Sequence, residues 1–242
     1  MSSQHTTGGI FITFEGPDAS GKTTQIGMLE QYLKEAEIGC VLTREPGGTG
    51  IGDQIRNILL DRKNESILPV TEALLYAASR AQLTGEVIRP ALQRGCVVIS
   101  DRFLDSSIAY QGFGRGLGDI VRAVNEPAVN GIRPDLTFLL KTEPSVMRRR
   151  RTASEEDRMD AQKEAFHREV LRGYLQLAEK EPERIRVIDG EQPPDTIAAE
   201  IRRCVEEILA RRAERLPAER KYGKKTEKCE ISQRTESSES RE

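Results

Sequence analysis

The sequence predicts an α/β fold in which a parallel sheet carries helices on both faces. The first observation is that short apolar segments, of the length of buried strands, alternate with helical periodicity along the 242 residues. The second is the segment 16–23, GPDASGKT, which fits the phosphate-binding pattern GxxxxGK(S/T). An apolar segment at 10–14 precedes the motif and a helical pattern at 24–37 follows it, as a P-loop requires.

The other elements follow from the same alternation. Apolar or β-branched residues over four or five positions indicate each strand, and an apolar stripe at helical spacing indicates each helix. We expect strands at 10–14, 40–43, 97–100, 136–140 and 185–188. We expect helices at 24–37, 51–61 and 69–93, one that begins at Pro144, and two later ones that carry the stripes Phe166, Val170, Tyr174, Leu177 and Ile197, Ile201, Val205, Leu209.

The composition of the chain changes at both ends, which bounds a single domain at 10–212. Residues 1–9 are polar and lack the pattern of a secretory signal, so we expect a flexible N-terminal tail. The segment 213–242 is rich in Lys, Glu, Arg and Ser, and we expect it to be a charged, disordered tail. No segment approaches the roughly twenty apolar residues of a membrane span, so we expect no membrane partner.

Charge and cysteine usage favour a cytoplasmic protein that does not bind nucleic acid. Lys and Arg total 37 against 39 Asp and Glu, a formal net charge of -2, so there is no global attraction to nucleic acid. Cys40, Cys96, Cys204 and Cys229 have no C-x-x-C spacing. We therefore expect reduced thiols rather than a disulfide framework or a zinc site.

The phosphate loop indicates a nucleotide with a bound magnesium ion. Gly16 and Gly21 let successive backbone N–H groups turn toward phosphate oxygens at a helix N-terminus. Lys22 is expected to contact the β- and γ-phosphates, and the Thr23 hydroxyl to bind Mg²⁺. The expected nucleotide-binding positions are Gly16, Pro17, Asp18, Ala19, Ser20, Gly21, Lys22, Thr23 and Thr24. A glycine-rich turn that matches by chance is the alternative, and the flanking strand and helix argue against it.

Candidate ligand residues also lie after a predicted strand, on a predicted helix and in a run of arginines. Asp101 ends the strand at 97–100, where a carboxylate can bind a magnesium-bound water; the alternative is a helix cap. Tyr76 and Arg80 share a helix face, suited to stacking on a base and donating to its edge, although Tyr76 taken alone is more suited to packing. The arginine run 148–151 is a solvated face, a targeting or nucleic-acid patch, or a set of cations that close over a transferring phosphoryl group.

Four segments together resemble bacterial thymidylate kinase. They are 14–25 (FEGPDASGKTTQ), 43–49 (TREPGGT), 76–80 (YAASR) and 101–112, which begins DRF and ends AYQG. The resemblance extends over about 10–209. It implies the P-loop fold of the nucleoside monophosphate kinases with a five-stranded parallel sheet, and a cytosolic homodimer that converts ATP and dTMP into ADP and dTDP for dTTP synthesis.

The same resemblance assigns roles to residues of the acceptor site. It implies that Asp18 binds the deoxyribose 3′-hydroxyl, and that Arg56 and Arg102, with Arg44 nearby, bind the acceptor phosphate. It implies that Tyr76 stacks on the thymine ring and that Arg80 donates to thymine O4. Ser107 and Gln111 are expected at the N3 edge of the base, and Tyr110 beside the ribose 2′ position.

The variable positions of the phosphate loop, 17–20, include no basic residue. The resemblance is therefore to the type in which a lid, here about 148–160, supplies the catalytic arginines. Arg149, Arg150, Arg151 and Arg158 are candidates that spacing does not separate; we expect Arg150, Arg151 and Arg158 to act with Lys22, Asp18 and Arg102. Two alternatives remain: another nucleotide kinase of the same fold, and a P-loop switch that hydrolyses nucleotide slowly.

Overall fold

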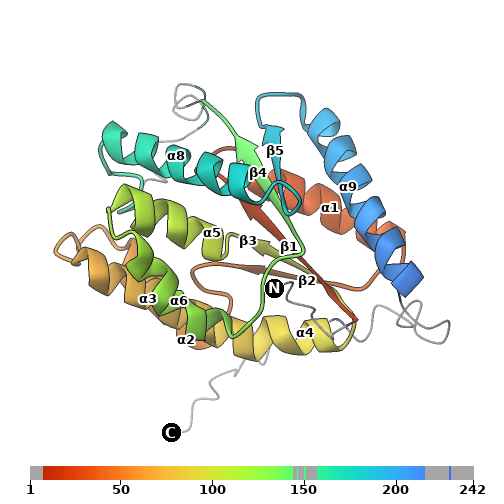
Figure 1. Ribbon diagram of the computed structural model, residues 1–242, viewed down its shortest axis with the longest axis horizontal. Helices are drawn as coiled ribbons and strands as arrows, with labels where there is room; N and C mark the ends of the chain where they lie inside the picture. The colour runs from red at the N-terminus through yellow and green to blue at the C-terminus, as the bar shows by residue number, and fades with distance from the viewer. Residues whose placement is uncertain (1–7, 144–145, 147–149, 151–156, 216–228, 230–242) are drawn as a thin grey trace, which may run out of the picture.

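A five-stranded parallel sheet runs through the computed structural model, in the spatial order β2-β3-β1-β4-β5 (Figure 1). The structure describes residues 8–143, 146, 150, 157–215 and 229. The strands are β1 Ile10–Glu15, β2 Cys40–Arg44, β3 Val97–Asp101, β4 Leu136–Lys141 and β5 Ile185–Asp189. All pairings are parallel, and the fold class predicted from the sequence is confirmed.

The strand register brings the chain's polar strand ends to one edge of the sheet. Phe14 of β1 and Arg44 of β2 both pair with Asp101 of β3, and Glu15 pairs with Leu139. The loop 16–21 leaves β1 at this edge, between the neighbours β3 and β4. Ligands of open α/β sheets bind at such a point, outside the carboxyl ends of the strands.

Helices cover both faces of the sheet. They are α1 Lys22–Glu35, α2 Gly50–Leu60, α3 Pro69–Leu83, η1 Thr84–Ile88, α4 Arg89–Gln93, α5 Leu104–Ser107, η2 Ile108–Gly114, α6 Asp119–Val129, α8 Glu164–Lys180 and α9 Pro194–Arg215. Local sequence explains several starts: Thr49 caps α2 by accepting from the Gly52 N–H at 2.9 Å, and Pro69 occupies the first turn of α3.

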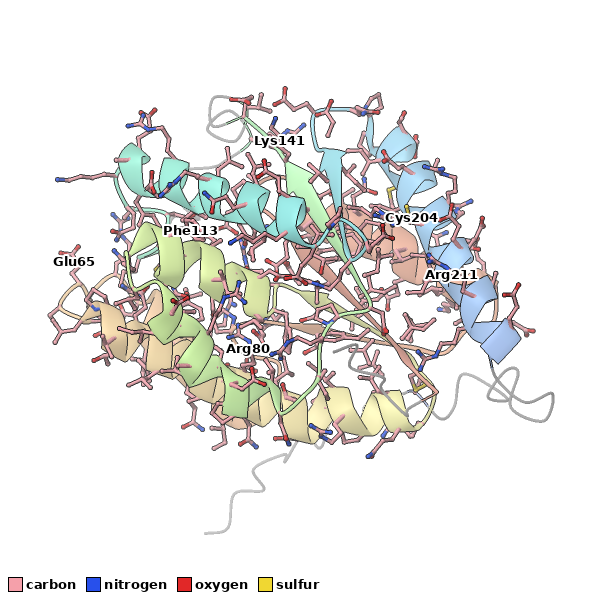
Figure 2. All side chains as sticks on the ribbon, in the orientation of Figure 1. Glu65, Arg80, Phe113, Lys141, Cys204 and Arg211 are labelled. Carbon is pink, nitrogen blue, oxygen red and sulfur yellow. A yellow bond between two sulfur atoms is a disulfide. The ribbon has the colours of Figure 1, made fainter. Side chains whose placement is uncertain are left out.

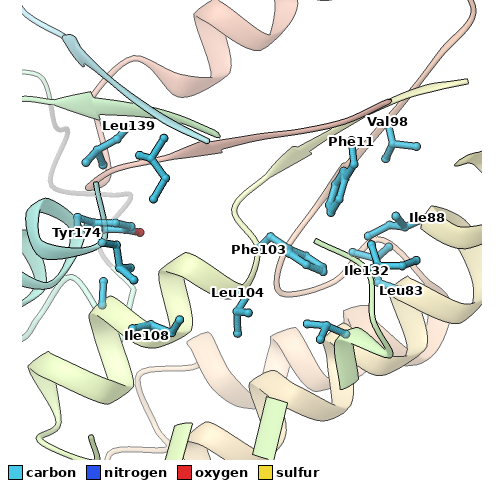
Figure 3. Close-up of a cluster of buried hydrophobic side chains, with 14 of the residues drawn as sticks. Phe11, Leu83, Ile88, Val98, Phe103, Leu104, Ile108, Ile132, Leu139 and Tyr174 are labelled. Atoms are coloured by element: carbon cyan, nitrogen blue, oxygen red, sulfur yellow. The ribbon is translucent and has the colours of Figure 1, made fainter. Parts of the chain in front are cut away.

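Alternation along the strands divides the core into two layers. Ile10, Ile12 and Phe14 of β1 face α1 and α9, which pack together on one side of the sheet (Figure 1). Phe11 faces the opposite way into a larger cluster with Phe103 and Tyr174 (Figure 3). This second layer carries α3, α5, η2 and α8, the elements that build the site described below.

Helix α6 was not expected from the sequence. Its buried face includes Asn125 beside Val121 and Val129, and Pro127 lies inside it, a placement that is not typical of a helix. The expected helix at 69–93 is present as the continuous run α3, η1 and α4. The helix expected at Pro144 begins outside the described residues.

The cysteine prediction was wrong for one pair. Cys96, just before β3, forms a disulfide with Cys229, and their Cα atoms are 6.0 Å apart. Cys229 is buried against Gly39, where an added Cβ would lie 2.6 Å from its Sγ. Spacing could not reveal this pairing because 133 positions separate the two residues. Cys40 and Cys204 are free thiols, as expected.

The ordered domain extends slightly past both expected boundaries. Gly9 is buried and its N–H donates to the Leu92 carbonyl at 3.0 Å, so the ordered part begins before residue 10. Helix α9 continues to Arg215, three residues past the expected end. The remainder of the predicted tails lies outside the described residues, apart from Cys229. None of the helices in the described part of the chain combines the length and apolar character that crossing a bilayer requires.

Candidate active site

The phosphate loop has a backbone that glycine makes possible. Gly16 and Gly21 have φ angles of 127° and 100°, which side chains with a Cβ rarely adopt. An added Cβ at Gly16 would also lie 2.5 Å from the Leu140 carbonyl oxygen. Gly21 immediately precedes α1, so the loop ends at a helix N-terminus, whose first N–H groups make no bond within the helix and can bind an anion.

Lys22 lies folded over the loop. Its Nζ donates to the carbonyl oxygens of Gly16 at 3.2 Å and Pro17 at 2.9 Å, and lies 3.9 Å from Asp18 Oδ1. Burial lowers the pKa of Lys22, and the charge of Arg102 lowers it further. A phosphate bound at the loop would raise the pKa of Lys22 again, because its negative charge stabilises the protonated amine.

Thr23 and Asp101 fit the magnesium site expected from the sequence. Thr23 is exposed at the start of α1, and Asp101 ends β3 beside β1. The Oδ1 atom of Asp101 is buried and accepts no hydrogen bond within the described part of the chain. A buried carboxylate oxygen with no donor suits a cation or its water, because Mg²⁺ at nucleotide sites uses one or two protein oxygens besides the phosphates.

An open cleft enclosing about 470 Å³ of empty space lies beside the loop. The cleft is lined by Asp18, Glu45, Pro46, Arg56, Leu60, Tyr76, Arg102, Ser106, Ser107, Tyr110, Gln111, Asp157 and Met159. Seven of the nine predicted acceptor residues are in this set; Arg44 and Arg80 are not.

Arg102 is the cation that joins the loop to the cleft. Its Nη2 donates to Asp18 Oδ1 at 2.8 Å, and its Nη1 donates to Ser106 Oγ and the Tyr174 hydroxyl, both at 3.2 Å. Burial alone would lower the pKa of Arg102, but Asp18 and its other neighbours raise it well above its ordinary value. The residue has a φ of 72°, a strained conformation typical of functional positions.

A buried carboxyl group stands behind Arg102. Glu15 is fully buried and accepts from the Phe103 N–H at 2.8 Å, from Ser106 Oγ at 2.5 Å and from the Tyr174 hydroxyl at 3.0 Å. Burial, with a smaller effect of Asp105, raises its pKa to about 7. No sequence pattern signals this role, because Glu15 is the last residue of an otherwise apolar strand.

Arg56 and the two tyrosines expected at the acceptor line the cleft. Arg56 Nη1 donates to the Pro46 carbonyl at 2.9 Å, and burial together with the charge of Arg44 lowers its pKa. Burial raises the pKa values of Tyr76 and Tyr110, so both remain neutral. The Arg102 guanidinium lies 5.3 Å from the centre of the Tyr110 ring, a cation–π contact.

Arg80, labelled in Figure 2, is not among the residues that line the cleft. Its side chain is 1% exposed and forms a buried ion pair with Glu45 at 2.5 Å. Burial raises the pKa of Glu45 to about 7, although the charge of Arg80 acts to lower it. It also donates to Ser107 Oγ at 3.0 Å, to the Phe103 carbonyl at 3.0 Å and to Asn125. These partners occupy both terminal nitrogens, whereas Nε is buried and has no partner among the described residues, so the expected contact with a base edge stays a prediction.

The three arginines expected to act from the lid, Arg150, Arg151 and Arg158, differ in where the structure places them. Arg150 Nη1 donates to the Gly190 carbonyl at 3.0 Å, and Gly190 packs against Ser20 of the phosphate loop. Arg151 lies outside the described residues. Arg158 is 4% exposed, pairs with the fully buried Glu72 at 2.7 Å and donates to the Leu59 carbonyl, so it forms a buried ion pair here, and its role toward the phosphoryl group stays a prediction.

Arg44 does not line the cleft, and its expected role near the acceptor phosphate stays a prediction. It is exposed and pairs with Asp53 at 3.1 Å, outside the set that lines the cleft. Several lining residues were not predicted: Glu45 and Pro46 lie in the segment 43–49, where the resemblance assigned a role only to Arg44, and Ser106 sits next to a predicted residue. Asp157 and Met159 come from the lid segment, where the sequence carries no pattern that marks a wall of a cleft.

A parallel sheet with a phosphate loop after β1, and beside it a cleft lined by two arginines and two tyrosines, defines a nucleotide kinase of the P-loop class. Comparison with known proteins makes the class specific, because a family model described as thymidylate kinase matches residues 14–201. The chain belongs to the thymidylate kinase family.

Individual relatives agree with this assignment. The chain is 48% identical over 204 residues to a thymidylate kinase of Symbiobacterium thermophilum, covering 84% of this chain and 95% of the relative. It is 44% identical over 210 residues to a thymidylate kinase of Nitratidesulfovibrio vulgaris, covering 83% and 98%. The crystal structure of a thymidylate kinase from Ehrlichia chaffeensis is similar at a TM-score of 0.66 and 33% identity, covering 82% of this chain and 98% of that one.

Proposed function

We propose that the chain transfers the γ-phosphate of ATP to dTMP, giving ADP and dTDP, with ATP at the phosphate loop and dTMP in the adjacent cleft. The reaction is that of the thymidylate kinase family. The observation that carries the placement is that Arg102 contacts the loop residue Asp18 and lines the cleft at the same time. One guanidinium can therefore neutralise charge on both phosphates as they approach.

The donor phosphates are held by the loop amides and Lys22. Transfer of a phosphoryl group asks the protein chiefly to position two phosphates in line and to spread their charge. Thr23 and Asp101 would hold Mg²⁺, which when bound neutralises charge on the donor phosphate oxygens. Arg150, tied to Gly190 beside Ser20, is the described lid arginine best placed to join them.

The acceptor is held at both of its ends. Arg56 and Arg102 take the monophosphate, Tyr76 stacks on the base, and Tyr110 fills the space beside the sugar. Asp18 accepts from the sugar hydroxyl. A phosphate monoester with a second pKa of about 6 is already largely ionised near neutral pH, so the nucleophile needs no strong general base.

A panel of monophosphates tests this proposal. With ATP and Mg²⁺ supplied, we expect dTMP to give the highest kcat/KM among dTMP, dUMP, dCMP, dGMP and dAMP. A different best acceptor would assign the chain to another nucleotide specificity. Nucleotide hydrolysis without any acceptor, unchanged by Arg102→Ala, would indicate a P-loop switch.

We also propose that the chain is a homodimer that associates through the outer faces of α2, α3 and α6. These helices pack side by side (Figure 1), and they and the residue before α3 expose large apolar side chains, namely Ile51, Ile58, Leu68, Val70, Leu74 and Ile120. A patch of this kind favours a protein partner. In sedimentation, Leu74→Glu should give monomers, whereas Val187→Glu, at a similarly exposed residue of β5, should not. A Leu74→Glu dimer contradicts the proposed interface.

A cytoplasmic location completes the proposed function, because the substrates are nucleotides of dTTP synthesis. The argument from reduced cysteines no longer supports this location, since Cys96 and Cys229 are paired. Fractionation of cells that produce the chain would test it.

A further inference from the structure

Glu72 lies at the centre of a buried ionic cluster beneath the cleft. It is on α3, one turn before Tyr76, and its side chain is fully buried. Arg115 contacts both carboxylate oxygens, at 3.2 Å and 3.0 Å, and Arg158 contacts Oε2 at 2.7 Å. Gln111 donates its Nε2 to Oε1 at 3.0 Å. Each carboxylate oxygen therefore accepts from two donors.

This cluster keeps Glu72 ionised. Burial alone would raise the pKa of Glu72, but the hydrogen bonds from Arg115 and Gln111 and the charges of Arg115 and Arg158 hold it below its ordinary value. An ionised carboxylate accepts hydrogen bonds and donates none. Its neighbours must therefore turn donors toward it.

The orientation of the Gln111 amide follows from this requirement. A glutamine side chain has a donor end and an acceptor end, and Glu72 fixes the donor end. The acceptor, Oε1, is buried and has no partner among the residues that the structure describes. Since Gln111 lines the cleft, Oε1 is the amide atom left for an occupant.

Ser107 offers the cleft a hydrogen-bond donor, whereas Gln111 offers an acceptor. Its Oγ accepts from Arg80, and Arg80 is itself held by Glu45. The hydroxyl hydrogen of Ser107 is thus left to donate into the cleft, which Ser107 also lines. The pair therefore presents one donor and one acceptor to a base edge.

We propose that Glu72 is a positioning residue for base selection: by fixing the acceptor end of Gln111, it makes the cleft favour a 4-oxo pyrimidine with a protonated N3 over cytosine. Uracil and thymine present an acceptor at O4 and a donor at N3. Cytosine presents a donor at N4 and an acceptor at N3, which opposes the order of Ser107 and Gln111. The inference rests on the proposed function, which places the base in this cleft.

The test compares dUMP with dCMP, because these substrates differ only at positions 3 and 4 of the base. In Glu72→Gln, residue 72 can donate as well as accept, so the Gln111 amide is free to reverse. We expect the dUMP:dCMP ratio of kcat/KM to fall about 10- to 100-fold, the range expected when a buried hydrogen-bonding group is paired in one complex and left unpaired in the other. The change should appear in the KM of the acceptor and leave the KM of ATP unaltered.

Asp105→Asn is the matched control. It also removes a buried carboxylate paired with an arginine, Arg184 at 2.6 Å, but Asp105 does not line the cleft that would hold the base. The control should lower stability and keep the dUMP:dCMP ratio. A Glu72→Gln enzyme that keeps the wild-type ratio, with both substrates slowed equally, would show a purely structural role and overturn the inference.

Gln111→Leu keeps the test decisive if Glu72→Gln does not fold, because Glu72 retains both arginines in that variant. Its dUMP:dCMP ratio should fall by a similar factor, and an unchanged ratio would overturn the inference. A wild-type enzyme that makes no dTDP from dTMP would overturn the proposed function as well, so the two failures are distinguishable.

Discussion

Replacing Glu15 by Gln should remove a pH dependence of stability that the wild-type protein shows. Burial raises the pKa of Glu15 from 4.5 to about 7 in the folded protein. Between these values the folded state binds a proton that the unfolded chain releases. The stabilisation is therefore complete below pH 4.5 and is lost as the pH rises through 7. The amide of the Glu15→Gln variant does not titrate in this range.

The size of the effect follows from the change in pKa. At roughly 1.4 kcal/mol for each pH unit, the free energy of unfolding should fall by about 2 to 3 kcal/mol from pH 5 to pH 8 on account of Glu15. The amide can replace the carboxyl group with little strain, because the Ser106 and Tyr174 hydroxyls can accept as well as donate.

Urea unfolding at pH 5, 6, 7 and 8, at one protein concentration, measures this difference. Other titrating groups are common to both proteins, so the difference between the two profiles isolates Glu15. Glu164→Gln, an exposed carboxylate of α8, controls for removing a charge and should leave the profile parallel to wild type. Parallel profiles for wild type and Glu15→Gln would refute the account of the buried carboxyl group.

Three further outcomes are expected. Lys22→Ala should abolish formation of dTDP while unfolding in urea as wild type does, and substantial remaining turnover would remove the lysine from the mechanism. Arg102→Ala should lower kcat/KM for dTMP by at least about tenfold, since it removes charged hydrogen bonds worth about 1.5–3 kcal/mol each. Unchanged kinetics would contradict the role of Arg102 in binding phosphate between the loop and the cleft. Without reductant, Cys229→Ser should lower the free energy of unfolding by up to about 4 kcal/mol while leaving turnover intact, and with reductant it should match wild type; equal stability in both conditions would contradict the disulfide.

Features that depend on local pattern could be predicted from the sequence. Short apolar segments predicted all five strands, and the phosphate loop was recognisable because its glycines and lysine are close together in the chain. Asp18, Arg56 and Tyr76, which lie in or near recognisable motifs, line one cleft, and their contacts with ligands stay predictions.

The sequence was insufficient where a residue's role depends on distant partners. Arg80 and Arg158 look like ligand residues in the chain, yet each is neutralised by a buried glutamate, Glu45 or Glu72, from another element. Whether an arginine meets a substrate or a carboxylate is decided by tertiary packing, which no local pattern encodes. The pairing of Cys96 with Cys229 is hidden in the same way.

The most direct measurement follows one phosphoryl group from donor to acceptor. Purified enzyme, Mg²⁺ and dTMP are mixed with ATP labelled at the γ-phosphate, and the products are separated. If the loop and the cleft hold the two nucleotides side by side, the label appears in dTDP, with one ADP formed for each dTDP. Release of the label as inorganic phosphate, with dTMP unchanged, would contradict the account.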